Sequence, residues 1–171
     1  MALERLWAGW RTEYIDTVVG PDATQDENCL FCALPGVEPD EALIVLRRDH
    51  AYAVLNAYPY TSGHVMVVPI RHVAELDDLD DDEAREVMTM TQQATTAIRT
   101  AYSPEGMNVG MNLGRAAGAG VPGHLHVHVL PRWAGDTNFM TSVAEARVLP
   151  EPLSKALERL RAAWPSAESR S

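Results

Sequence analysis

The feature that most constrains this chain is a run in which histidine alternates with apolar residues, His124-Leu-His126-Val-His128-Val-Leu. Successive side chains of a β-strand point to opposite faces. The run therefore predicts a strand over 124–130, with the three imidazoles on one face and opening onto a single site. The residues alone leave three uses open: metal ligands, a histidine nucleophile whose neighbours bind the phosphate it attacks, or polar surface residues.

The segment before this strand, residues 114–123, is rich in glycine. Glycine lets the backbone approach a ligand closely and offer N–H groups to an anion, which favours phosphate. A flexible connection without a ligand explains this segment equally well when it is taken alone. The net charge of −10, from 14 basic and 24 acidic residues, argues against a nucleic-acid partner. A small anion held in one pocket remains compatible with it.

The composition is that of an ordinary globular protein, with 46% hydrophobic and 22% charged residues. The length of 171 residues suits a single domain over 1–171. No apolar stretch is long enough to span a bilayer, and the first residues lack the pattern of a signal peptide. We therefore expect no membrane partner and a cytoplasmic protein.

Periodicity and turn residues predict one α+β domain with its core over 29–139. Asp80 and Glu83 have the spacing of a capping box at the start of a long helix. The expected elements are a helical segment over 3–15, strands over 42–47, 51–55, 64–69, 107–113 and 124–130, a helix from Asp80 to Tyr102 and a C-terminal helix over 153–164.

The two cysteines, Cys29 and Cys32, form a Cys-x-x-Cys motif. In a cytosolic protein such a pair is usually a metal site or a redox centre. A polar segment precedes it and Pro-Gly follows it, which does not fit a thioredoxin-like strand and helix. Two thiolates need two further ligands for a tetrahedral zinc site.

The sequence HLHVHVL resembles the signature of the histidine triad family of nucleotide hydrolases and transferases. VLNAYPYTSGHVMVVPIRH and NVGMNLG resemble two further segments of that family, so the likeness covers about residues 29–139. The flanks LERLWAGWRTEYI and PRWAGDTNFM resemble the branch that contains diadenosine tetraphosphate phosphorylases and ATP adenylyltransferases. The resemblance implies a HIT-like α+β fold, with an antiparallel five-stranded sheet, one long helix and a C-terminal helix.

This resemblance implies a role for each matching residue. The middle histidine, His126, is the nucleophile, with its other ring nitrogen held by a backbone carbonyl that we expect in the glycine-rich loop. His128 and His64 stabilise the charge that develops on the phosphate. Positions with an implied role in nucleotide binding are Asn56, Asn112, Gly120 and Arg132. Gly120 stands where many hydrolases of the family have Gln, which favours the phosphorylase or transferase branch.

The resemblance also implies structural zinc, bound by Cys29, Cys32, His72 and His124, and a homodimer joined by the long helix and a strand edge. The expected activity is nucleotidyl transfer or phosphorolysis of a dinucleoside polyphosphate, through a covalent nucleotidyl-histidine, with a purine nucleotide as ligand. Two alternatives remain: hydrolysis of nucleoside phosphoramidates or dinucleoside polyphosphates, and a non-catalytic nucleotide-binding sensor.

Overall fold

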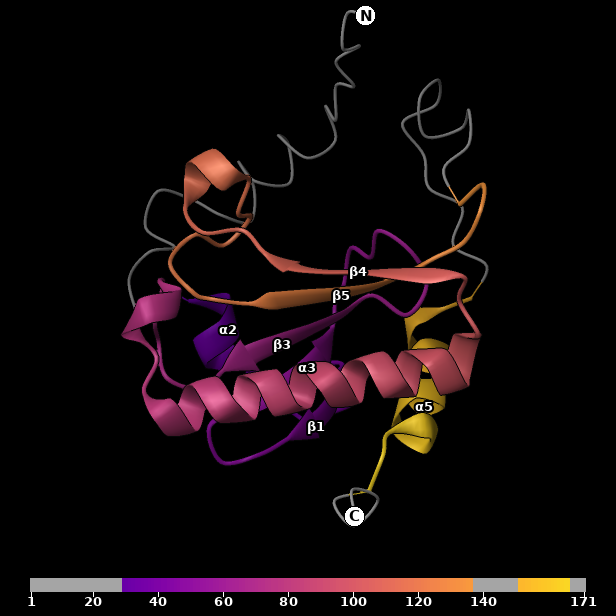
Figure 1. Ribbon diagram of the computed structural model, residues 1–171. Coiled ribbons are helices and arrows are strands. Elements are labelled where there is room, and N and C mark those ends of the chain that lie inside the picture. The colour runs from indigo at the N-terminus through magenta and orange to yellow at the C-terminus, as the bar shows by residue number, and fades with distance from the viewer. Residues whose placement is uncertain (1–28, 137–150, 167–171) are drawn as a thin grey trace, which may run out of the picture.

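The computed structural model describes residues 29–136 and 151–166, and these form one antiparallel sheet with helices against it (Figure 1). The strand order is β1-β2-β3-β5-β4, so the predicted five-stranded α+β fold is confirmed. The predicted helical segment 3–15 lies outside the described residues. The strands are β1 Ile44–Arg47, β2 Ala51–Leu55, β3 Val65–Pro69, β4 Gly106–Met111 and β5 Val127–Arg132. The helices are α2 Leu30–Ala33, α3 Asp81–Tyr102 and α5 Leu153–Ala163, with short 3-10 turns η2 Leu34–Gly36, η3 Leu76–Asp78 and η4 Arg115–Ala117.

Helix α3 crosses one face of the sheet (Figure 1) and contacts β2, β3 and β5. Its start is the predicted capping box: the Asp80 carboxylate accepts the N–H groups of Asp82 and Glu83, and the Glu83 carboxylate accepts the N–H of Asp80. The apolar face of α3 packs into the main core, together with α5 and the inner face of the sheet. Among the described residues, no helix combines the length and apolar character needed to cross a bilayer.

The last predicted strand differs from the observed one, because β5 runs from Val127 to Arg132 rather than over 124–130. The N–H of Leu125 donates to the carbonyl of Val73 at 2.6 Å, so the chain before Val127 bonds to the segment after β3 instead of joining the ladder. Pro131 lies past the last residue pair with β3, Val65 with Val129, where β5 pairs with β4 alone. The expectation of three histidines in one row on a strand is therefore wrong, since only His128 lies in β5.

The first predicted strand also starts later than expected. Leu43 has φ of +58°, a left-handed conformation that interrupts an extended chain, and β1 begins at the next residue. Strand β4 ends at Met111, before Asn112.

Candidate functional site

Four side chains converge on one point beyond the end of β3 and the start of β5: Cys29, Cys32, His72 and His124, which we call the metal corner. Their donor atoms all lie within 4.8 Å of one another. Nδ1 of His124 is 3.3 Å from Sγ of Cys29 and 3.5 Å from Sγ of Cys32, and Nδ1 of His72 is 3.3 Å from Sγ of Cys32. This set could hold a metal ion.

The geometry of the metal corner fits a tetrahedral ion bound by sulfur and nitrogen. Ordinary Zn–S and Zn–N bond lengths at tetrahedral angles place neighbouring S and N donors about 3.6 Å apart, close to the observed distances. Nε2 of His124 is 2.9 Å from the carbonyl oxygen of Pro69. A carbonyl only accepts, so this contact assigns the proton to Nε2 and directs the Nδ1 lone pair at the thiols, as expected of a metal-ligating histidine.

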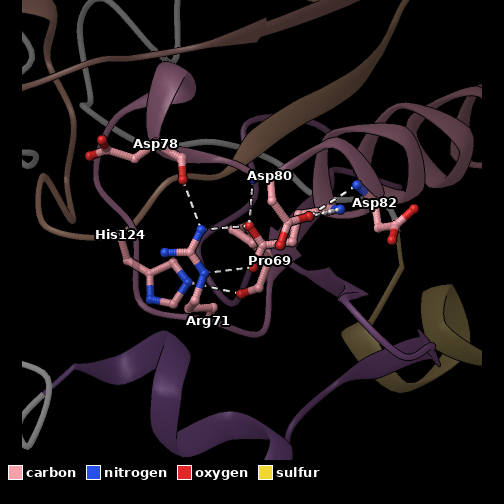
Figure 2. Close-up of polar contacts among 7 residues, drawn as sticks. Pro69, Arg71, Asp78, Asp80, Asp82 and His124 are labelled. Atoms are coloured by element: carbon pink, nitrogen blue, oxygen red, sulfur yellow. Dashed lines mark hydrogen bonds and ion pairs between the residues drawn. The ribbon is translucent and has the colours of Figure 1, made fainter.

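The buried carboxylate of Glu83 anchors the segment that carries His72. Its partner is Arg71, which Figure 2 shows bonded to Asp78. Arg71 donates from Nε and Nη2 to the Glu83 carboxylate at 2.7 and 2.6 Å, and from Nη2 to the carbonyl of Asp78 at 2.8 Å. The guanidinium of Arg71 holds the pKa of Glu83 below its usual range, against the opposing effect of burial. The capping carboxylate of α3 therefore also anchors the residue next to a metal-corner ligand.

The second cluster is the pocket corner, formed by His64, His126 and His128. His126 is buried, and its Nδ1 lies 2.8 Å from the carbonyl oxygen of His124. The predicted carbonyl acceptor is therefore present, although it belongs to His124 rather than to the glycine-rich loop 114–123. This bond assigns the proton to Nδ1 and leaves the lone pair on Nε2. Burial lowers the pKa of His126, while the bond to His124 acts in the opposite direction, and the net effect favours the neutral, nucleophilic ring.

A backbone N–H sets the protonation of His64, and His64 in turn sets that of His128. The N–H of Tyr60 donates to Nδ1 of His64 at 3.3 Å, so the proton of a neutral His64 is on Nε2. That nitrogen is 2.9 Å from Nδ1 of His128, which places the proton of His128 on its own Nε2. The rings of His126 and His128 are 4.8 Å apart between centroids and nearly perpendicular. The ring of His126, with its lone pair on Nε2, thus packs edge to face against the ring of His128, whose N–H is on Nε2.

A cavity of about 180 Å³ opens beside these two rings. Among its lining residues are His126, His128, Asn56 and Gly120, whereas Asn112 and Arg132 are not. The polar groups of the three predicted nucleotide-binding side chains bond within the protein. Oδ1 of Asn56 accepts the N–H of Tyr58 at 2.9 Å, and Nδ2 of Asn112 is 3.5 Å from the carbonyl of Gly118. The guanidinium of Arg132 bonds to the side chains of Asp136 and Asn108. Within residues 29–136 and 151–166, no lysine or arginine lines the cavity, and the acidic lining residue is Glu41. A phosphate next to the two histidines would be met by imidazole and backbone N–H groups. The remaining lining is largely apolar and comes mostly from α2, residues 41–43, β2 and the loop after it.

Phe31 connects the two corners, and the sequence analysis gave it no role. Its ring centroid is 5.5 Å from that of His124 and 5.0 Å from that of His126. The buried hydroxyl of Tyr52 donates to the Phe31 carbonyl at 2.7 Å. The sequence could have indicated this role, because Phe31 lies between Cys29 and Cys32. Two cysteines that bind one metal ion also fix the positions of the residues between them.

Comparisons with known proteins agree with this geometry. The model of the HIT domain family matches residues 38–135. A Mycobacterium tuberculosis protein named AP-4-A phosphorylase is 42% identical over 165 residues, covering 95% of this chain and 85% of that protein. A zinc-bound histidine triad family protein from Mycobacterium smegmatis superposes with a TM-score of 0.65 at 28% identity, covering 81% of this chain and 94% of that one. A hypothetical histidine triad nucleotide-binding protein from Sulfolobus tokodaii gives a TM-score of 0.64 at 27% identity, covering 79% and 91%. The chain therefore belongs to the HIT domain family and is an enzyme.

Proposed function

We propose that this enzyme transfers a nucleotidyl group from a dinucleoside polyphosphate, such as diadenosine tetraphosphate, to inorganic phosphate. The observation that carries the proposal is the arrangement at the cavity wall, where the ring of a buried His126, with Nδ1 bonded to the carbonyl of His124, packs against the ring of His128. The likeness to the mycobacterial protein named AP-4-A phosphorylase supports the choice of substrate and acceptor.

In the first step, Nε2 of His126 attacks the α-phosphorus, a P–N bond forms, and the P–O bond to the departing nucleoside polyphosphate breaks. The N–H of His128 donates to oxygen on the reacting phosphate and stabilises the charge that grows there. The Nδ1–H of His126 stays on the carbonyl of His124, which stabilises the cationic ring of the nucleotidyl-histidine.

In the second step, an oxygen of inorganic phosphate attacks the same phosphorus. A P–O bond forms, the P–N bond breaks, and His126 recovers its lone pair. The products are a nucleoside diphosphate and the nucleoside polyphosphate released in the first step. The two half-reactions use the same groups in opposite directions.

Asn56 and Gly120 line the cavity, which supports nucleotide-binding roles for them, toward the sugar and phosphate of the nucleotide. Asn112 and Arg132 take part only if the polyphosphate extends beyond the cavity. Arg132 must then exchange its bonds to Asp136 for bonds to the ligand.

We infer that the ion of the metal corner is zinc and that it is structural. Cys29, Cys32, His72 and His124 supply all four ligands of a closed tetrahedral site, and the zinc-bound mycobacterial structure supports the choice of ion. When bound, the ion neutralises two thiolates and joins the α2 segment to the chain before β5. His126 stays outside this ligand set, so its Nε2 remains available for chemistry while its Nδ1 bonds to the carbonyl of His124.

We also infer a cytoplasmic homodimer. Strand β4 is an edge of the sheet, Val109 on it is 50% exposed and Met88 on α3 is 53% exposed, which suits a contact between two copies. The thiols of Cys29 and Cys32 are not joined by a disulfide, as a reducing compartment requires. Sedimentation of the purified chain at several concentrations tests the dimer, and a monomer throughout would contradict it.

The decisive experiment compares wild type, His126→Ala and His50→Ala on radiolabelled diadenosine tetraphosphate. The exposed His50 in the β1–β2 turn is the matched control. We expect a nucleotidyl adduct in wild type and His50→Ala after quenching in denaturant at alkaline pH, where the P–N bond to histidine survives, and none in His126→Ala. Nucleoside diphosphate should form only when phosphate is present. Equal product without phosphate identifies the hydrolase alternative, and binding without turnover or adduct identifies the nucleotide sensor.

A further inference from the structure

The loop before β3 contains Gly63, and the ring of Tyr102 occupies the space where a side chain at this position would lie. Gly63 has φ of +78°, and a Cβ at this position would lie 2.6 Å from Cε2 of Tyr102. A side chain is therefore excluded both by the backbone conformation and by the ring. The ring of Tyr102 lies directly against the Cα of the residue that precedes His64.

Tyr102 is the last residue of α3, and groups from the C-terminal part of the chain hold it in place. Its hydroxyl donates to Oε1 of Glu151 at 2.6 Å. The guanidinium of Arg159 lies 5.2 Å from the centroid of the Tyr102 ring, and its Nη2 is 3.5 Å from Oε2 of Glu151. Burial and the neighbouring carboxylate raise the pKa of Tyr102, so the hydroxyl remains a donor at neutral pH.

Glu151 and Arg159 lie outside residues 38–135, the part of the chain that matches the HIT domain model. Both residues contact Tyr102, and Tyr102 packs against the loop that carries His64. The same loop is also bonded to β5, where Oγ1 of Thr61 donates to the carbonyl of Pro131 at 3.1 Å. His64 is itself fully buried. The position of its ring therefore depends on the backbone that carries it as well as on its own contacts with Tyr60 and His128.

We propose that Tyr102, held by Glu151 and Arg159, is a positioning residue for His64 and thereby for the N–H of His128. The ring under Gly63 sets the distance at which Nε2 of His64 donates to Nδ1 of His128. That donation keeps the proton of His128 on the nitrogen used in the proposed reaction. This inference rests on the proposed function for its kinetic consequence, and on the structure alone for its effect on the His64–His128 bond.

The test uses the full-length Tyr102→Ala variant and two measurements. Steady-state kinetics with a dinucleoside polyphosphate should show kcat lowered about tenfold, because small displacements of catalytic groups are costly, with KM altered less than about twofold. Imidazole ¹⁵N NMR should show the His64 Nε2–H signal shifted or exchange-broadened. A purely structural role would lower stability and leave that signal and kcat unchanged.

Arg161→Gln is the matched control, because Arg161 lies on the same helix but bonds to the carbonyl of Ile44 and to Asp40. It should lower the melting temperature through the loss of these bonds while α5 stays packed on the core through its buried Ala156, Leu157 and Leu160, and it should leave kcat and the His64 signal as in wild type. Tyr102→Phe, which keeps the ring, and Glu151→Gln should show smaller changes in the same direction. They serve as the test if Tyr102→Ala does not fold. The inference is overturned if the His64 signal does not move in the Tyr102 and Glu151 variants. It is also overturned if the signal and kcat change as much in Arg161→Gln as in those variants. If wild type lacks the proposed activity but the signal moves as expected, only the proposed function fails.

Discussion

The metal corner and the pocket corner share one short stretch of chain, yet they are constructed in opposite ways. The four donors of the metal corner come from α2, the segment after β3 and the turn before β5, and no ladder pairs these segments around the donors. In the pocket corner, His128 lies in β5 opposite Met66 of β3, and His64 and His126 directly precede β3 and β5. Backbone groups set the protonation of His64 and His126, and His64 sets that of His128. The proposed zinc would thus join the donors of the first corner, whereas the second corner is attached directly to the sheet. Stability and activity should therefore respond to different histidines.

Helix α3 braces both corners, one at each end. Glu83 at its start holds the segment of His72 through Arg71, and Tyr102 at its end supports the loop of His64 through Gly63. The two sets of contacts differ in how far apart in the sequence their residues lie. The contacts at the start of α3 include a local capping box, whereas those at its end join three remote residues, Gly63, Tyr102 and Glu151.

The largest expected effect is a difference between substitutions of His126 and His124, which are only two residues apart: the first should lose activity and the second metal and stability. His126→Ala should lower turnover about 10³-fold or more and keep one zinc per chain and the wild-type melting temperature. His124→Ala should lose the zinc and a large part of the stability. Turnover, metal analysis and calorimetry on both variants check this. Loss of metal in His126→Ala would mean that the histidines act together as metal ligands, and the comparison of the corners would be wrong.

The next effect is on stability alone. Cys29→Ser, or chelation of wild-type protein, should lower the free energy of unfolding by about 3 kcal/mol or more, because the binding energy of a structural ion is part of the folding energy. Adding chelator to Cys29→Ser should then have no further effect, and this is its control. A chelator that leaves wild-type melting unchanged while the metal is removed would contradict a structural role.

A smaller effect concerns the brace at the start of α3 and depends on pH. Arg71 holds the folded-state pKa of Glu83 below its unfolded value, so this carboxylate stabilises the fold above the unfolded pKa. That contribution is lost as the pH falls through the folded pKa. Glu83→Gln should lower the melting temperature by about 2–4 °C at pH 7, and the difference from wild type should shrink below about pH 4. Thermal melts at pH 7, 5 and 3.5 measure it, and a difference that grows on acidification would contradict the assignment.

These contrasts also explain how far the sequence could predict the structure. The capping box at Asp80 was predictable because its two residues are three apart and bond to each other. The four metal-corner residues followed from a family resemblance and are confirmed as a cluster. The start of β5 was not predictable, because the bond from Leu125 to Val73 is tertiary and removes the residues before Val127 from the ladder. The contact of Tyr102 with Gly63 has no local pattern at all, since a tyrosine ending a helix and a glycine in a turn are both ordinary.

The smallest expected effect refines the account of the pocket corner. Thr61→Val keeps the shape of the side chain but removes the hydroxyl that donates to the carbonyl of Pro131, one of the bonds that hold the loop of His64. Loss of a single neutral hydrogen bond costs about 1 kcal/mol, and we expect kcat to fall about twofold with little change in melting temperature. Thr95→Val is the control, because its exposed hydroxyl bonds only within α3, to the carbonyl of Gln92. If both variants retain wild-type kcat, the loop is held by Tyr102 and by its own backbone bonds, and the hydroxyl of Thr61 contributes nothing to the position of His64.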